Sequence, residues 1–124
     1  MASAAASTTL SAADVTPPCE IPCGTQAELT ANWSIVDNNN DGAGDETTWE
    51  FSSSDNAAVY SYNRNNAADD WLIAKSPVAL KAGETYKVTG NIKTYNNYTK
   101  ESIAFYTATA DNVEALSLIH ISEP

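Results

Sequence analysis

The sequence predicts an all-β protein folded as a β-sandwich or jelly roll. Two observations predict this fold. Between residues 33 and 80, short runs rich in Trp, Tyr, Val and Ile alternate with loops of Asn, Asp, Gly and Ala, and the runs follow one another closely. Aromatic and β-branched side chains fit a pleated, half-buried surface, whereas Asn, Asp and Gly tolerate the left-handed backbone of tight turns. Many short strands separated by turns are typical of sandwiches and jelly rolls.

The size and charge of the chain restrict its function. Its 124 residues suffice for one domain with a modest core. Sixteen acidic and six basic residues give a formal net charge of −10, which argues against a nucleic-acid binder and against attachment to an anionic bilayer surface. No run approaches the roughly 20 apolar residues of a membrane span, so we expect no membrane insertion. The N-terminus lacks the features of a signal peptide, so a signal for export would lie upstream.

The N-terminal part of the chain reads as a linker followed by a strand and a helical turn. Residues 1–18 have the Ala/Ser/Thr/Pro composition of a linker or of the tail of an upstream region. Residues 19–23 are expected to form a short first strand. Thr25 and Glu28 have the spacing of a capping box, which predicts one helical turn ending near Ala31.

The two cysteines, Cys19 and Cys23, allow two interpretations. On an extended strand they lie about 13 Å apart, too far for a disulfide, and would be buried free thiols that act as small hydrophobic groups. A bend at Pro22 would instead allow a disulfide. A zinc site would need more ligands, and His120 is the only histidine in the sequence.

The rest of the chain is predicted to consist of strands and turns. Residues 85–93 alternate between an apolar face and a polar face, which predicts a strand of a sheet with one wet side. Turns are expected at 81–84 and 95–100, and a short helix capped by Thr109 at 110–115. The other expected strands are at residues 33–36, 48–51, 57–62, 70–74, 77–80 and 102–107.

The last nine residues, 116–124, resemble the in-frame translation of a transposase-based sequencing-adapter end. On this interpretation native sequence stops near Ala115, His120 carries no function, and the closing strands of a sandwich covering residues 19–115 are missing. The alternative is a genuine apolar strand over residues 116–121, which the periodicity permits. The codons of the gene distinguish the two, because codons that differ from the adapter would exclude the first.

The loop that begins at Asp37 matches the front of a calcium-loop pattern. Oxygen-bearing side chains stand at loop positions 1, 3, 5 and 9 with Gly at position 6, the arrangement that turns alternate residues inward. Position 12 is Thr48 where that pattern has a bidentate Glu, and the flanks read as strands, so an ordinary EF-hand is not expected. A calcium-stapled β-loop and a plain turn without an ion both remain open. The loop residues that would be ligands are Asp37, Asn39, Asp41 and Asp45.

A second acidic pair, Asp69 and Asp70, precedes the strand that contains Trp71. Neighbouring side chains on a strand point to opposite faces, so at most one of these carboxylates faces inward. An inward carboxylate needs an ion or backbone donors, since an unpaired buried charge is costly. We therefore add both residues to the candidate calcium ligands. A solvated strand entry is the alternative.

Four aromatic residues, Trp49, Tyr60, Tyr62 and Trp71, are candidates for a ligand-binding platform on which sugars would stack. Aromatic side chains at alternate strand positions are also common in cores, and both interpretations stay open. Catalysis has little support, because the sequence has no nucleophile with an evident base and no clear acid pair in a cleft. We expect no catalytic residues, and hence a protein that is not an enzyme.

These pieces in their order and spacing resemble the cleaved-adhesin, or choice-of-anchor J, family of bacterial surface domains. The likeness extends over about residues 19–115. It departs at Cys19 and Cys23, where the family more usually has aromatic residues, and in the absent closing strands. The motifs that carry it are WSIVD at 33–37 with its Asn/Asp/Gly loop, TW at 48–49, YSYN at 60–63, AADDWLI at 67–73, PVALKAG at 77–83, and Tyr86.

The resemblance implies a jelly-roll, galactose-binding-like β-sandwich, often calcium-bearing, incomplete here at its C-terminus. Members occur in exported multidomain proteins of Bacteroides-type bacteria, including the haemagglutinin–adhesin regions of gingipain proteases. It therefore implies a non-catalytic, secreted or cell-surface module that binds host protein or glycan, beside other domains of the same native chain, with calcium in a structural role. The alternative is an accessory β-sandwich domain of a surface protease or glycoside hydrolase; a plain spacer is a third interpretation.

Overall fold

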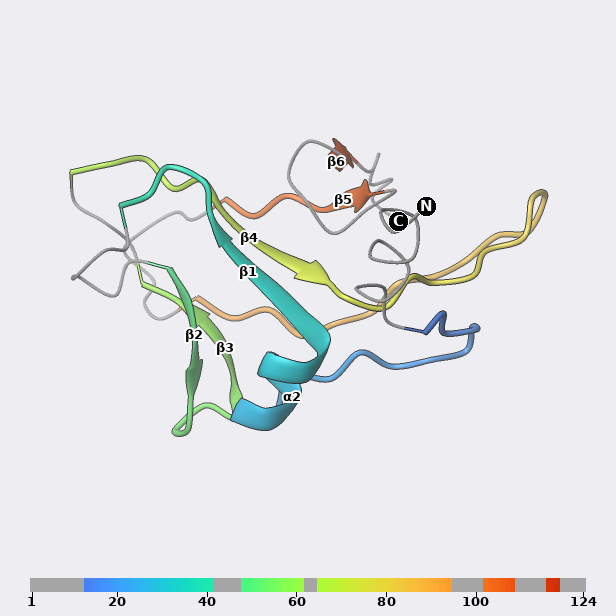
Figure 1. Cartoon of the computed structure of the whole chain (residues 1–124), viewed down its shortest axis with the longest axis horizontal. Helices are drawn as coiled ribbons and strands as arrows, with labels where there is room; N and C mark the ends of the chain where they lie inside the picture. The colour runs from blue at the N-terminus through green and yellow to red at the C-terminus, as the bar shows by residue number, and fades with distance from the viewer. Residues whose placement is uncertain (1–12, 42–47, 62–64, 95–101, 109–115, 119–124) are drawn as a thin grey trace, which may run out of the picture.

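The computed structural model describes residues 13–41, 48–61, 65–94, 102–108 and 116–118. This part of the chain is mainly β, as predicted, with small antiparallel sheets and one short helix (Figure 1). Each sheet has two strands, in the pairs β1–β4, β2–β3 and β5–β6. The elements are α2 Gln26–Asn32, β1 Trp33–Asp37, β2 Trp49–Ser52, β3 Ala57–Tyr60, β4 Asp70–Ala74, β5 Tyr106–Ala108 and β6 Leu116–Leu118.

The helix α2 begins where the capping-box spacing predicts. Thr25 has an extended backbone, and its hydroxyl accepts a hydrogen bond from the Glu28 backbone N–H at 3.1 Å. The Glu28 carboxylate accepts from the Gly24 backbone N–H at 2.8 Å, one residue before the usual target of a capping box. The helix ends at Asn32 because Trp33 is already extended and starts β1.

The core lies where α2 meets the β1–β4 sheet. Leu29 of α2 is 1% exposed and Ile73 of β4 is 7% exposed, and these are the buried hydrophobic residues of the described chain. The pairing of β1 with β4 joins Trp33 to Ala74 at one end and Asp37 to Asp70 at the other. It continues past β4, where the Lys75 backbone N–H donates to the Asn32 carbonyl at 2.8 Å.

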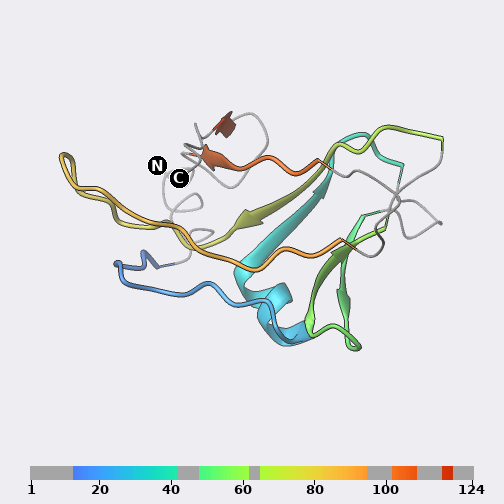
Figure 2. The same cartoon turned by 180° about the vertical axis from the view of Figure 1, so that it is seen from behind.

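The second sheet is the local hairpin of β2 and β3, in which Trp49 pairs with Tyr60 and Ser52 with Ala57. Its turn has Asn56 in the left-handed region at φ 51°, a conformation that Asn tolerates better than most residues. The Ser52 hydroxyl donates to the Asp55 carboxylate at 2.6 Å and closes the turn. The hairpin contacts β4, which brings β2 to the side of the first sheet (Figure 2).

Residues 75–94, which we call the arm, run outward from the end of β4 and return (Figure 1). The turn predicted at 81–84 is present: the Glu84 backbone N–H donates to the Lys81 carbonyl at 3.3 Å, and Gly83 has φ 82°, where a side chain would be strained. The strand predicted at 77–80 is reduced to a single parallel bridge between Val78 and Val15. The strand predicted at 85–93 is wrong for this structure, since these residues form no ladder and every one of them is exposed.

The strand predicted at 19–23 is also wrong, since these residues are irregular. Both cysteines are free thiols: Cys19 is exposed and Cys23 half-buried. Burial as a small hydrophobic group therefore does not describe Cys19.

The third sheet pairs β5 with β6, with Tyr106 opposite Leu118. The strand expected at 102–107 is shorter and lies further along the chain, at Tyr106–Ala108. The strand β6 lies at the start of the tail, in agreement with the apolar pattern there. The codons of the gene distinguish a native tail from an adapter-derived one. The turn at 95–100, the helix at 110–115 and His120 lie outside the described residues, as do residues 1–12 of the linker.

Candidate metal centre

Two of the predicted ligands face each other because of the register of the first sheet. Asp37 is the last residue of β1 and Asp70 the first of β4, and the two are paired across the strands. Directly opposed like charges destabilise a sheet. The sequence therefore places two carboxylates together where the fold itself gains nothing from their repulsion.

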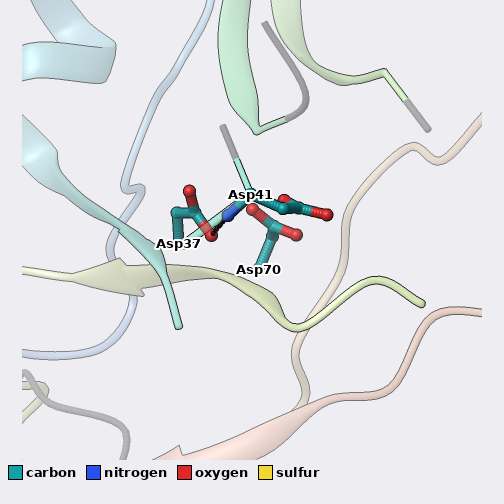
Figure 3. A group of neighbouring side chains, drawn as sticks. All are labelled: Asp37, Asp41 and Asp70. Carbon is teal, nitrogen blue, oxygen red and sulfur yellow. Dashed lines mark hydrogen bonds between the residues drawn. The ribbon is translucent and has the colours of Figure 1, made fainter. Parts of the chain in front are cut away.

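A third carboxylate joins them from the loop that follows β1. Asn40 adopts the left-handed conformation at φ 56° and turns the chain back, so that the Asp41 backbone N–H donates to the Asp37 carboxylate at 3.2 Å. One carboxylate oxygen from each of Asp37, Asp41 and Asp70 lies within 4.8 Å of the others. Figure 3 shows the three side chains converging at the ends of β1 and β4.

The Asp70 carboxylate is shielded from solvent. Both of its oxygens lack a hydrogen-bond partner, and the nearby Thr48 hydroxyl is likewise shielded without one. Burial is the main cause that raises the pKa of the Asp70 carboxyl above its ordinary value. The Thr48 hydroxyl lies close enough to favour the ionised form and lowers this pKa in part, although its geometry falls short of a hydrogen bond, while the charges of Asp37 and Asp41 raise the pKa further.

Asp69 has a different role from Asp70, as alternate strand directions require. Its Oδ1 accepts from the Trp71 indole N–H at 2.7 Å, and its Oδ2 accepts from the Asn38 amide at 2.6 Å. The Asn39 amide donates to the Ala67 carbonyl at 2.8 Å. These bonds tie the loop after β1 to the segment before β4, and so they hold the acidic cluster in place.

The sequence-predicted ligands thus divide into three groups. Asp37, Asp41 and Asp70 come together; Asn39 and Asp69 hold the loops beside them; Asp45 lies outside the described residues. Position 12 of the calcium-loop pattern, Thr48, lies beside Asp70. The acidic group that the local pattern lacks there is contributed by β4, far away in the sequence.

The predicted aromatic residues form two separate contacts beside the cluster. Trp49 and Tyr60 pair across the hairpin with ring centroids 5.7 Å apart, and the Trp49 indole donates to the Asp70 carbonyl at 3.3 Å. Trp71 meets Tyr106 edge-on at 4.9 Å. The four rings of these two contacts, including that of Tyr106, are half-buried. The remaining predicted aromatic residue, Tyr62, lies outside the described residues. Each indole therefore packs against another ring and also donates a hydrogen bond beside the cluster, Trp49 to the Asp70 carbonyl and Trp71 to the Asp69 carboxylate.

Two of these contacts, Thr48 with Asp70 and Tyr106 with Trp71, could not be predicted from local sequence patterns. Thr48 does not match the ligand expected at position 12 of the EF-hand pattern, and Tyr106 lies more than thirty residues from Trp71 in the sequence. A cross-strand register would have found the first, because a strand that begins at Trp49 and contacts β4 places Thr48 near the start of β4.

The arrangement suits a hard divalent cation. Calcium binds oxygen ligands at about 2.4 Å, so ligands on opposite sides of the ion lie about 4.8 Å apart. Three carboxylate oxygens within 4.8 Å of one another can therefore reach a single ion. A cation would also neutralise the opposed charges and give the Asp70 oxygens a partner.

No protein-family model, curated protein or solved structure matches this chain. Among the described residues, no helix is long and apolar enough to cross a bilayer.

Proposed function

We propose that the chain is a calcium-stabilised, non-catalytic binding module of an exported bacterial surface protein, built as a jelly-roll sandwich that binds host protein or glycan. The observation that carries the calcium part is the Asp70 carboxylate, shielded and without a hydrogen bond, opposite Asp37 and beside Asp41. The adhesive part rests on the resemblance of the motifs between residues 33 and 86 to cleaved-adhesin domains.

The ion would be structural. Asp37 ends β1, Asp41 closes the following loop and Asp70 begins β4, so one cation would join the two strands of the central sheet to the loop at the same end. Loops at the end of a β-framework are common binding surfaces. Calcium would therefore fix the loops that a ligand contacts, and ligand binding would depend on calcium without any bond between the two.

Calcium titration by calorimetry tests the site. We expect saturable binding of calcium chloride to the wild type, with affinity in the range of extracellular modules, on the order of 10⁻⁴ to 10⁻³ M. Asp70→Asn should abolish it. Glu50→Gln, which removes an exposed charge on β2, should leave it unchanged and is the matched control. No heat of binding in the wild type, or equal loss in the control, would refute the site.

The adhesive function is tested separately, by a screen of glycans and host extracellular proteins against the domain in calcium and in chelator. Binding that needs both calcium and the intact cluster supports the proposal. A uniformly blank screen on the chain completed with its native C-terminal sequence would leave a spacer domain as the better interpretation.

A further inference from the structure

The outer part of the arm, beyond its bridge to Val15, is apolar on one side and has no strand partner among the described residues. Residues 77–94 are all exposed, and the exposed apolar side chains include Val88 at 86%, Ile92 at 60% and Leu80 at 58%. Tyr86, Val88 and Ile92 alternate with polar residues and so share one face of an extended segment. Beyond residue 80, the described hydrogen bonds of the arm backbone are local: the Glu84 N–H donates to the Lys81 carbonyl, and the Lys81 N–H donates to the Tyr86 hydroxyl at 2.8 Å.

The charge of the arm is opposite to that of the rest of the molecule. It holds four of the six basic residues and one of the sixteen acidic ones, so its formal charge is +3 in a chain of −10, and the remainder carries −13. The basic residues are regularly spaced, with Lys87 and Lys93 on the face opposite Val88. A surface that is both apolar and basic is complementary to an acidic protein surface.

We propose that the arm docks on the rest of a second copy of this chain, which we call the body. There it adds a strand to an open sheet edge. In the part of the chain that the structure describes, such edges are present, because β1–β4 and β2–β3 each have two strands there. An extended segment that adds to an edge gains main-chain hydrogen bonds and buries its alternate side chains.

Charge favours docking of the arm on the body over pairing of two arms. Pairing of one arm with another arm would bring together two segments of charge +3, whereas arm on body brings +3 to −13. Reciprocal exchange, in which each arm docks on the other copy, closes with two-fold symmetry and leaves no further arm exposed. The assembly is therefore a dimer that does not grow.

The oligomeric state of the full chain tests the proposal, measured by sedimentation against concentration in chelator. We expect a reversible monomer–dimer equilibrium that weakens as salt is raised, and slower amide exchange over residues 85–93 at high concentration. Val88→Lys removes the apolar contact and raises the arm charge from +3 to +4, so charge attraction is not lost, yet the dimer dissociation constant should rise about tenfold or more. Thr89→Gln, on the opposite face of the same segment, is the control and should change it little.

A second variant separates charge from apolar burial. Lys87→Glu combined with Lys93→Glu leaves the apolar face intact and turns the arm charge from +3 to −1, and it should weaken the dimer most at low salt. A chain that stays monomeric at all concentrations, or one that grows without limit, overturns the proposal. So does association equally sensitive to Val88→Lys and Thr89→Gln, or indifferent to salt.

Discussion

The β1–β4 pair and the arm have similar residue patterns and opposite outcomes. Both contain short runs of Val, Ile and Tyr or Trp, bounded by turn residues. β1 and β4 are fully paired over five residues each, with Ile73 buried. Residues 84–94 of the arm form no ladder, and all of them are exposed. The two regions differ in what lies beside them: α2 contacts β1, and β1 and β4 pair with each other, whereas no described strand pairs with the part of the arm after Gly83.

The comparison shows that β-propensity describes a surface that can be covered, and that a strand forms only when a partner covers it. Removing a side chain from the two regions should therefore have very different effects on stability.

Truncation of the core should have the largest effect. Leu29→Ala removes the most buried side chain of the described chain and should lower the free energy of unfolding by about 2–5 kcal/mol. Val88→Ala, in the arm, should change it by less than about 0.5 kcal/mol, measured at a concentration where the chain is monomeric. Urea unfolding of both variants checks the pair, and equal destabilisation would show that the arm is part of the folded core.

Removal of the Asp69 carboxylate, which joins the two loops, should have the next largest effect on stability. Asp69→Ala loses the hydrogen bonds from Trp71 and Asn38, and it should cost about 1–3 kcal/mol because both are made to a carboxylate. Asp14→Ala, an exposed acid at the edge of the described chain, is the matched control and should be near neutral. If the two variants unfold alike, the loops are not held together by Asp69.

The pH dependence of the body gives a smaller effect with a definite sign. The pKa of Asp70 is raised in the folded chain, chiefly by burial, so the folded state holds this proton more tightly than the unfolded state. Without calcium, the contribution of Asp70 to stability is favourable below its unfolded-state pKa. It is lost as pH rises from there through the folded-state pKa, and the cost of ionisation is complete above both.

Asp70→Asn should remove this dependence and, in chelator at neutral pH, stabilise the chain by up to about 1 kcal/mol, since it relieves the opposed charges. Urea unfolding between pH 4 and 8 measures both effects. The account predicts that the Asp70 contribution to stability falls as pH rises. It would be contradicted if the wild type became more stable over this pH range relative to Asp70→Asn.

The local parts of the fold could be predicted from sequence, and the parts that need a distant partner could not. Thr25 and Glu28 identify the start of α2, and the run at 70–74 matches β4 residue for residue, because caps and periodicity are read within a few residues. Residues 85–93 alternate equally well, yet they form no strand. Alternation reports which faces differ, and it does not report whether another strand lies alongside.

The candidate site divides in the same way. The loop pattern identified Asp37 and Asp41, and the strand alternation required Asp69 and Asp70 to differ in direction, as they do in this structure. Which of that pair faces Asp37 depends on the register of β1 against β4, a contact between residues 33 apart. The Trp49 indole on the Asp70 carbonyl depends on the packing of two sheets, which no local pattern contains.

The central claim is that one calcium ion joins the ends of β1 and β4, and thermal unfolding in excess calcium and in chelator tests it most directly. At a calcium concentration of about 100 times the dissociation constant, binding stabilises the folded state by about 2.7 kcal/mol. The wild type should therefore melt on the order of 10 °C higher in calcium than in chelator. Asp70→Asn should melt at the same temperature in both, and Glu50→Gln should behave as the wild type. Identical wild-type curves in calcium and in chelator would contradict the claim.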